Sequence, residues 1–186
     1  MGDAFAEHLA LVEQVRTLGP KIDTVARRLI EVYTGGGRLF TFGNGGSSCD
    51  AQHFAEELIA RYRRERRPLA ASSLSSDASV LTCIGNDFGF EHVFSRQVEG
   101  LVRDGDMVVA FSTSGRSENV VRGLAAARAQ GATTVLFGGG EGRPASDHAD
   151  HAFLLTSTDT ARIQEMHVLL LHLIIDQVDE WAAAAS

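Results

Sequence analysis

Four hydroxyl side chains surround one glycine in the segment FSTSGRSENVV, residues 111–121. The segment follows the apolar run 107–110 and precedes an alanine-rich stretch, which indicates a strand that gives way to a helix. At a helix start, free backbone N–H groups and the helix dipole suit a phosphate group, and Gly115 permits a tight turn close to it. We therefore predict a phosphate-binding loop whose hydroxyl groups come from Ser112, Thr113, Ser114 and Ser117.

Helix capping is the simpler use of a serine at this place in a chain. A cap formed by Ser114 or Ser117 accounts for one hydroxyl group, whereas four within six residues favour a bound phosphate. The chain has no Gly-Lys-Ser/Thr of a P-loop, and GNGGSS (43–48) lacks the spacing of a dinucleotide-binding fingerprint. The expected ligand is a phosphorylated metabolite, and no nucleotide cofactor is expected.

The elements around this loop have the rhythm of a parallel sheet. Apolar residues recur at helical spacing over 5–15 and 22–33, with Gly19 and Pro20 between them. Segments long enough for helices separate five strand-like runs: RLFTF (38–42), LAASSL (69–74), MVVAF (107–111), TTVLF (133–137) and HAFLL (151–155). We predict a three-layer α/β fold with a five-stranded parallel sheet, N-terminal helices and a long helix over about 160–183. Chemistry is expected in the loops after the first and third strands.

Composition and charge exclude several classes of protein. At 186 residues with 44% hydrophobic content and no linker, the chain is predicted to be one domain over 1–186. The N-terminus lacks the pattern of a signal peptide, and VLLLHLII (168–175) is too short to span a bilayer, so no membrane partner is expected. Two cysteines give no disulfide framework and fit the cytoplasm. A net charge of -7 argues against nucleic acid as a partner.

Four segments together resemble one family. FSTSGRSENVV is similar to the phosphosugar-binding loop of SIS (sugar isomerase) domains. With GNGGSSCDAQHFAEEL (43–58), CIGNDFGFEHVFSRQVE (83–99) and RIQEMHVLLLH (162–172), nearly the whole chain resembles the phosphoheptose isomerases. The resemblance implies a flavodoxin-like SIS fold and a homotetramer with active sites at subunit contacts. It also implies isomerisation of sedoheptulose 7-phosphate to D-glycero-D-manno-heptose 7-phosphate, the first step toward nucleotide-activated heptose.

The same resemblance implies roles for individual residues. Glu57 matches the catalytic base of the family and His172 matches its acid/base partner. Zinc, which some members bind, would be held by His53, Glu57, Gln164 and His172. The positions that match substrate-binding residues, besides the four hydroxyl side chains of the loop, are Asn44, Gly45, Gly46, Arg61, Asn86, Asp87 and Gln164.

Three positions depart from the family pattern. Ser48 and Arg116 differ from frequent choices, and Ala161 stands before RIQE where some members carry an acidic residue. Arg116 bears on the shape of the phosphate loop, and Ala161 bears on activity or substrate preference.

The chemistry of the reaction agrees with the residue types. Ketose–aldose isomerisation moves a proton between C1 and C2 through an enediol, which needs a carboxylate-strength base and a group that shuttles protons at the oxygens. Glu57 and His172 supply one of each. Without the motif, however, His53 and Glu57 would be interpreted as a solvated i, i+4 pair. His172, among apolar neighbours, would be a core histidine in need of a polar partner.

Gln164 and His172 are poorly spaced for a single small metal ion. Eight residues of helix separate them by about 12 Å along the axis and roughly 80° around it. Either the two belong to sites contributed by different subunits, or Gln164 mainly contacts the substrate. His167, about 140° from His172, is expected to be structural.

The arginines of ARYRRERRP (60–68) are interpreted mainly as a solvated or interface-forming turn, with Arg61 leaning into the site. Cys49 and Cys83 are expected to be small buried residues, since nothing near them indicates an activated thiolate.

A second class of function stays open beside the isomerase. The chain is alternatively a non-catalytic SIS-type module that binds a phosphosugar or a partner protein, such as a replication initiator. The presence of both Glu57 and His172 favours the enzyme, because a binding module needs neither a base nor an acid.

Overall fold

The structure, a computed structural model, describes residues 2–184 as a three-layer α/β fold around one parallel sheet. The strands lie in the order β2-β1-β3-β4-β5 and every neighbouring pair is parallel. This is the flavodoxin-like strand order, in which ligands bind beyond the carboxyl ends of the strands. The strands are β1 (Leu39–Gly43), β2 (Ala71–Ser73), β3 (Met107–Ser112), β4 (Thr133–Gly139) and β5 (His151–Leu155).

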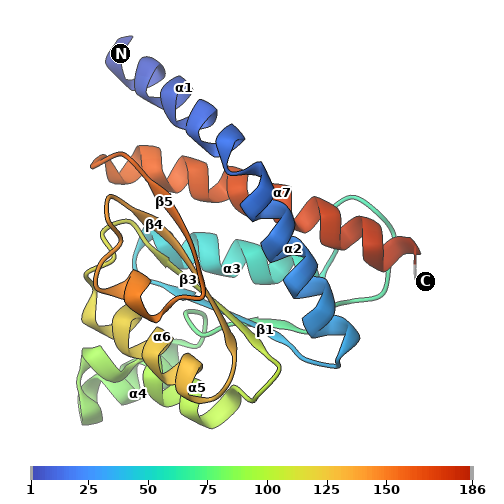
Figure 1. Ribbon diagram of the computed structural model, residues 1–186. Helices are drawn as coiled ribbons and strands as arrows, with labels where there is room; N and C mark the ends of the chain where they lie inside the picture. The colour runs from blue at the N-terminus through green and yellow to red at the C-terminus, as the bar shows by residue number, and fades with distance from the viewer. Residues whose placement is uncertain (1, 185–186) are drawn as a thin grey trace.

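Helices cover both faces of the sheet (Figure 1). In the figure α2, α3 and α7 lie on one side of it and α4, α5 and α6 on the other. The α-helices are α1 (Gly2–Thr17), α2 (Gly19–Thr34), α3 (Gly46–Ile59), α4 (Ala78–Phe88), α5 (Ser95–Leu101), α6 (Glu118–Ala129) and α7 (Thr160–Ala184). Two short 3-10 turns, η1 (Phe90–His92) and η2 (Ala145–His148), complete the fold.

The central strands β1, β3 and β4 supply both layers of the core because successive side chains point to opposite faces. In β3, Val109 and Phe111 pack with the layer of α2, α3 and α7. Val108 and Ala110 pack with α5 and α6 on the other side. Burial on both faces explains why the strands read as unbroken apolar runs, without the alternation of a half-exposed sheet.

The parallel register brings the functional loops to one edge of the sheet. Gly43, the last residue of β1, pairs with Phe111, and Ser112 pairs with Gly138 of β4. The segments that follow β1, β3 and β4 therefore lie side by side at the carboxyl ends of the strands. The predicted fold, its five strands and its long last helix are confirmed, and only β2 is notably shorter than the predicted strand at 69–74.

The prediction that both cysteines are buried is wrong, since Cys49 and Cys83 are exposed. Cys49 lies in the first turn of α3, at the open edge of the sheet. Cys83 lies on α4. Of the described residues in this helix, Ile84 is the one that is buried. The sequence interpretation assigned both cysteines to the core as small buried residues. In the structure they lie on helix faces that the rest of residues 2–184 leaves exposed.

None of the helices within residues 2–184 has both the length and the apolar character needed to cross a membrane.

Candidate active site

The serine-rich segment is the loop that joins β3 to α6, as predicted. Ser112 is buried at the end of β3, and Ser117 is the residue that precedes the first turn of α6. Gly115 adopts a φ of 65°, and a side chain there would collide with the backbone of Gly142 in the loop after β4. Only glycine allows the two loops this close an approach.

The capping alternative is not supported for Ser117. Its side chain forms no capping hydrogen bond with α6. Two other hydroxyls of the loop take part in its own turn: Ser112 Oγ accepts the N–H of Gly115 at 3.1 Å, and Ser114 Oγ accepts the N–H of Arg116 at 3.2 Å. Arg116 thus shapes the loop through its backbone, while its side chain is exposed.

A cavity of about 280 Å³ opens in front of this loop. It lies beside the first turns of α3, α6 and α7, where backbone N–H groups lack intrahelical partners. At α7 one of them, that of Ala161, donates to Asp159 Oδ1 at 2.9 Å. The concentration of hydroxyl groups and helix starts makes the cavity suited to an anion. Its lining residues are Asn44, Gly45, Gly46, Ser47, Phe111, Ser112, Thr113, Ser114, Ser117, Thr160 and Gln164.

Two contacts across the fold shape this cavity. Asn44 after β1 and Asn119 in α6 exchange side-chain hydrogen bonds of 2.8 and 2.9 Å, which tie together the first and third strand ends. Gly46 begins α3, and a side chain there would overlap the amide of Gln164 from α7. Gln164 therefore lies over the start of α3 and faces the cavity, as its predicted contact with substrate requires.

A second cluster gathers His53, Glu57 and His172. His53 and Glu57 lie one turn apart on α3, and His53 Nε2 is 3.1 Å from Glu57 Oε1. His172 comes from α7, with Nε2 4.0 Å from the same oxygen and its ring edge-to-face with that of His53. The interpretation of His53 and Glu57 as a purely solvated pair is incomplete, because a third polar side chain joins them from another helix.

The environment of His172 favours its neutral form. Partial burial lowers the pKa of His172, and the nearby His53 and Arg63 lower it further, while Glu57 opposes the shift. A neutral imidazole can accept a proton or bind a metal ion.

The three side chains fit a zinc ion by the chemistry of their donors. Two imidazole nitrogens and one carboxylate oxygen lie within 4.8 Å of one another. Two histidines and a glutamate form a known catalytic zinc set, which leaves a further coordination position open. The Gln164 amide lies instead against Gly46 at the start of α3, eight residues of helix away from His172, in agreement with the spacing argument from the sequence.

The two clusters are separated within one chain. Gly46 and Glu57 are eleven residues apart on α3, or about 16 Å along the axis, and Gln164 and His172 are about 12 Å apart on α7. An extended seven-carbon sugar phosphate is shorter than the first of these spans. The chain thus presents a hydroxyl-lined cavity at one end of the α3–α7 layer and a carboxylate–imidazole cluster farther along it.

Three of the predicted substrate-binding residues lie away from both clusters. Asn86 and Asp87 are exposed on α4, across the sheet from α3 and α7. Arg61 is exposed after α3, and no hydrogen bond or ion pair joins it to the rest of residues 2–184.

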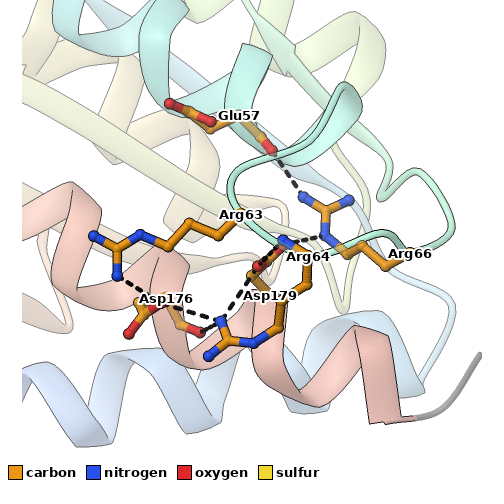
Figure 2. Close-up of polar contacts among 6 residues, drawn as sticks. All are labelled: Glu57, Arg63, Arg64, Arg66, Asp176 and Asp179. Carbon is orange, nitrogen blue, oxygen red and sulfur yellow. Dashed lines mark hydrogen bonds and ion pairs between the residues drawn. The ribbon is translucent and has the colours of Figure 1, made fainter.

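The sequence interpretation missed one part of the site's surroundings. Arg66 was grouped with the solvated arginines, yet its side chain is fully buried and paired with Asp179, which is also buried (Figure 2). A signal existed in the sequence: Asp176 and Asp179 stand at i, i+3 in the otherwise apolar last helix. Acidic residues at that spacing share a helix face and require partners when buried.

Comparison with known proteins gives one consistent family. Residues 5–139 match the family model described as SIS domain. The chain is 47% identical over 165 residues to the phosphoheptose isomerase of Roseiflexus sp. (strain RS-1), covering 89% of this chain and 84% of that protein. Its fold matches the phosphoheptose isomerase GmhA of Neisseria gonorrhoeae with a TM-score of 0.89 at 36% identity. It also matches a phosphoheptose isomerase from Francisella tularensis with a TM-score of 0.92 at 30% identity, and 96% of each chain is covered in both comparisons.

Proposed function

Since this chain belongs to the SIS domain family and is an isomerase of the phosphoheptose isomerase type, we propose that it converts sedoheptulose 7-phosphate to D-glycero-D-manno-heptose 7-phosphate. The reaction is proposed to be the first step of nucleotide-activated heptose biosynthesis and to take place in the cytoplasm. The observation that carries the proposal is the pairing of a hydroxyl-rich anion pocket with a carboxylate–imidazole cluster in one chain.

Substrate binding is assigned to the loop between β3 and α6. Backbone N–H groups and hydroxyls of this loop hold the phosphate, and charge-assisted hydrogen bonds of this kind are about twice as strong as neutral ones. Asn44, Gln164 and the backbone of Gly45 and Gly46 contact the sugar near the phosphate.

Proton transfer is assigned to Glu57 and His172. The Glu57 carboxylate removes the proton from C1 of the ketose and returns it to C2, so that an enediol forms and collapses to the aldose. His172 moves the proton between the oxygens at C1 and C2. Its lowered pKa keeps it neutral and able to accept that proton near neutral pH.

A zinc ion is proposed at His53, Glu57 and His172. When bound there it would polarise the sugar carbonyl as a Lewis acid. Nε2 of His172 cannot bind zinc and accept a proton at the same time. Whether zinc is bound therefore decides which of the two roles His172 has.

Complete active sites are proposed to form between subunits of a homotetramer. The separation between the phosphate pocket and the acid/base cluster supports this assembly, because a cluster from a neighbouring chain can approach the pocket more closely. The exposed apolar residues of the α4 region, Phe88 and Phe90, provide a surface for such contacts. Arg61, Asn86 and Asp87 would then reach a site that includes another subunit.

Incubation of the purified protein with sedoheptulose 7-phosphate tests the proposal directly. NMR should detect an aldoheptose 7-phosphate, and the Glu57→Gln variant should form none. Binding without turnover by the wild-type protein, in the presence of zinc, would favour the non-catalytic module.

A further inference from the structure

Residues 61–67, named here the arginine strap, follow α3 and lie against the second half of α7 (Figure 2). Arg63 and Arg64 pair with Asp176 Oδ1 at 3.4 and 3.1 Å. Arg64 also reaches Asp179 Oδ2 at 3.3 Å, and its backbone N–H donates to the same oxygen at 3.0 Å. Two acidic residues of α7 therefore hold the strap in a fixed position.

Arg66 joins the strap to both helices of the acid/base cluster. Its Nε donates to Asp179 Oδ1 at 2.8 Å, and both side chains are 0% exposed. Its Nη2 and Nη1 donate to the backbone carbonyls of Glu57 and Leu58 at 2.8 and 2.9 Å. These carbonyls belong to the last turn of α3, where intrahelical donors are lacking. The fork of the guanidinium thus ties the end of α3 to α7 in one geometry.

The strap places an aromatic ring on His172. The ring of Tyr62 stacks on the imidazole with centroids 5.5 Å apart and planes 21° apart. Arg63 covers the Tyr62 ring, with its Cζ 4.7 Å from the ring centroid. His53 meets the His172 ring at its edge, 5.0 Å between centroids.

Among residues 2–184, His172 has no hydrogen bond that could orient its ring, and the Glu57 carboxylate is 4.0 Å from its Nε2. An acid/base or metal-binding histidine is normally oriented by a hydrogen bond to its second ring nitrogen. Here two rings constrain the imidazole: His53 meets its edge, and Tyr62 lies over its face nearly parallel to it. The face contact with Tyr62 opposes rotation of the imidazole out of its plane. The hydroxyl of Tyr62 forms no hydrogen bond within the same residues, so the ring face is the part that matters.

We propose that Tyr62 is a positioning residue for His172, and that the ion pairs of the strap with Asp176 and Asp179 keep Tyr62 in place. Tyr62 does not touch the reacting atoms: it sets the direction in which His172 presents Nε2. The orientation of His172 by Tyr62 does not depend on the isomerase activity proposed above. Only its expected consequence, slower turnover when the orientation is lost, rests on that proposed function.

The first test compares two substitutions of Tyr62 by the NMR signals of ¹³C-labelled histidine. The stacked ring should shift the His172 signals upfield in the wild-type protein and in Tyr62→Phe, and this shift should be lost in Tyr62→Leu. The His172→Asn variant assigns the signals. An unchanged His172 shift in Tyr62→Leu overturns the proposal, whatever the protein catalyses.

Kinetics on folded variants give the second test. In Tyr62→Leu we expect kcat to fall roughly 10- to 100-fold, the scale of a small misplacement of a reacting group, with KM changed by less than about threefold. Tyr62→Phe should restore kcat to within about twofold of the wild type, because it keeps the stacked ring. A loss of the ring shift without a loss of kcat would refute the catalytic consequence. An inactive wild type would refute the proposed function and leave the NMR comparison to decide the orientation.

The anchoring role is tested by a double-mutant cycle. Asp176→Asn should lower kcat, and the combination with Tyr62→Leu should be no slower than Tyr62→Leu alone, since both act through the same ring. Arg67→Gln is the matched control, because Arg67 belongs to the strap but faces Trp181. Its kcat and His172 shift should equal those of the wild type. Additive losses in the double variant would show that Asp176 does not act through Tyr62.

Discussion

At the residue scale, the phosphate loop depends on hydroxyls that the fold leaves free. Ser117 is the clearest case, because it stands at the cap position of α6 without capping the helix. Ser112 and Ser114 accept backbone N–H groups of the loop, so their O–H groups can still donate to a ligand. The loop is therefore held in its turn by its own hydrogen bonds, and the proposed phosphate would need little ordering of it on binding.

Ser117→Ala should weaken binding of the sugar phosphate by about 1–3 kcal/mol, the value of a hydrogen bond to a charged group. The free energy of unfolding should change little because no internal hydrogen bond is lost. Calorimetric titration of the wild type and the variant measures the difference. Ser76→Ala, a substitution at an exposed serine outside the cavity, is the control. Equal affinity of the wild type for sedoheptulose and its 7-phosphate would contradict a phosphate site.

The cluster of His53, Glu57 and His172 is expected to bind one zinc ion per chain, since its donors are those of a catalytic zinc site. His53→Ala should lower zinc affinity by at least tenfold, measured by competition with a chelator, while His148→Ala, outside the cluster, should leave it unchanged. Removal of zinc from the wild type should lower turnover, and added zinc should restore it. Equal activity of the metal-free and zinc-loaded proteins would assign His172 to proton transfer alone.

At the element scale, the register between α3 and α7 determines what the site contains. The two helices carry Gly46 and Gln164 at one end and Glu57 and His172 farther along. Between them lies a buried pair, Asp50 and His167, with His167 Nδ1 3.8 Å from Asp50 Oδ2. His167 is thus a core residue, as its azimuth on the helix predicted. A shift of one helix along the other would disturb both ends together.

The Arg66–Asp179 pair stabilises this register. Asp179→Asn leaves the buried guanidinium without its counter-charge, so we expect a loss of about 3–5 kcal/mol in the free energy of unfolding. Urea denaturation at pH 7 and fixed protein concentration measures it. Glu13→Gln, in the exposed Arg16–Glu13 pair, should have no measurable effect. If Asp179→Asn changed the free energy of unfolding as little as Glu13→Gln does, the Arg66–Asp179 pair would not hold the helices together.

The stabilisation by Asp179 should disappear in acid. Burial alone would raise the pKa of Asp179, but hydrogen bonds from the Arg64 backbone and from Arg66 lower it below the usual value. The unfolded chain therefore takes up this proton at higher pH than the folded chain does. The contribution is complete above the ordinary pKa of about 4 and is lost as the pH falls through the lower folded value. The stability difference between wild type and Asp179→Asn should shrink accordingly below about pH 4.

At the scale of the whole molecule, one chain leaves apolar surface on two separate helices. Phe5 and Leu9 are exposed on α1, which extends away from the sheet (Figure 1), and Phe88 and Phe90 are exposed near α4. Patches of this kind are typical of subunit contacts, and closed two-fold symmetry is the usual arrangement for four identical chains. The tetramer is thus expected from surface chemistry as well as from the separated clusters.

Subunit mixing tests whether a site draws on two chains. One variant, with Ser114→Ala and Ser117→Ala, lacks two hydroxyl groups of the proposed phosphate loop. The second variant, Glu57→Gln, lacks the proposed base. In mixed tetramers, an intact loop of one chain can meet an intact cluster of the other, so activity should partly return after subunit exchange. No return of activity in verified mixed tetramers would place loop and cluster of each site in one chain.

The mixing experiment has an internal control. Oε1 of Glu57 and Nε2 of His172 lie 4.0 Å apart within one chain. Exchange between Glu57→Gln and His172→Asn variants should therefore restore nothing, because every cluster carries one lesion.

The sequence alone determined the helices and strands of this protein and the place of the serine-rich segment among them. Helices and strands follow from the local spacing of apolar residues, and the free N–H groups of a helix start likewise depend on the local chain. Such features depend on neighbours a few positions away. The five strands, the long last helix and the position of residues 111–121 between a strand and a helix could therefore be predicted without coordinates. The use of that loop for phosphate stays a prediction.

Only the tertiary structure decided what distant segments do together. The contact between Glu57 and His172, the burial of Arg66 and the stack of Tyr62 on His172 depend on how α3 and the strap pack on α7. The same packing decided the exposure of the cysteines, which composition had suggested to be buried. Burial and pairing are properties of two surfaces that meet, and the periodicity of either segment alone does not contain them.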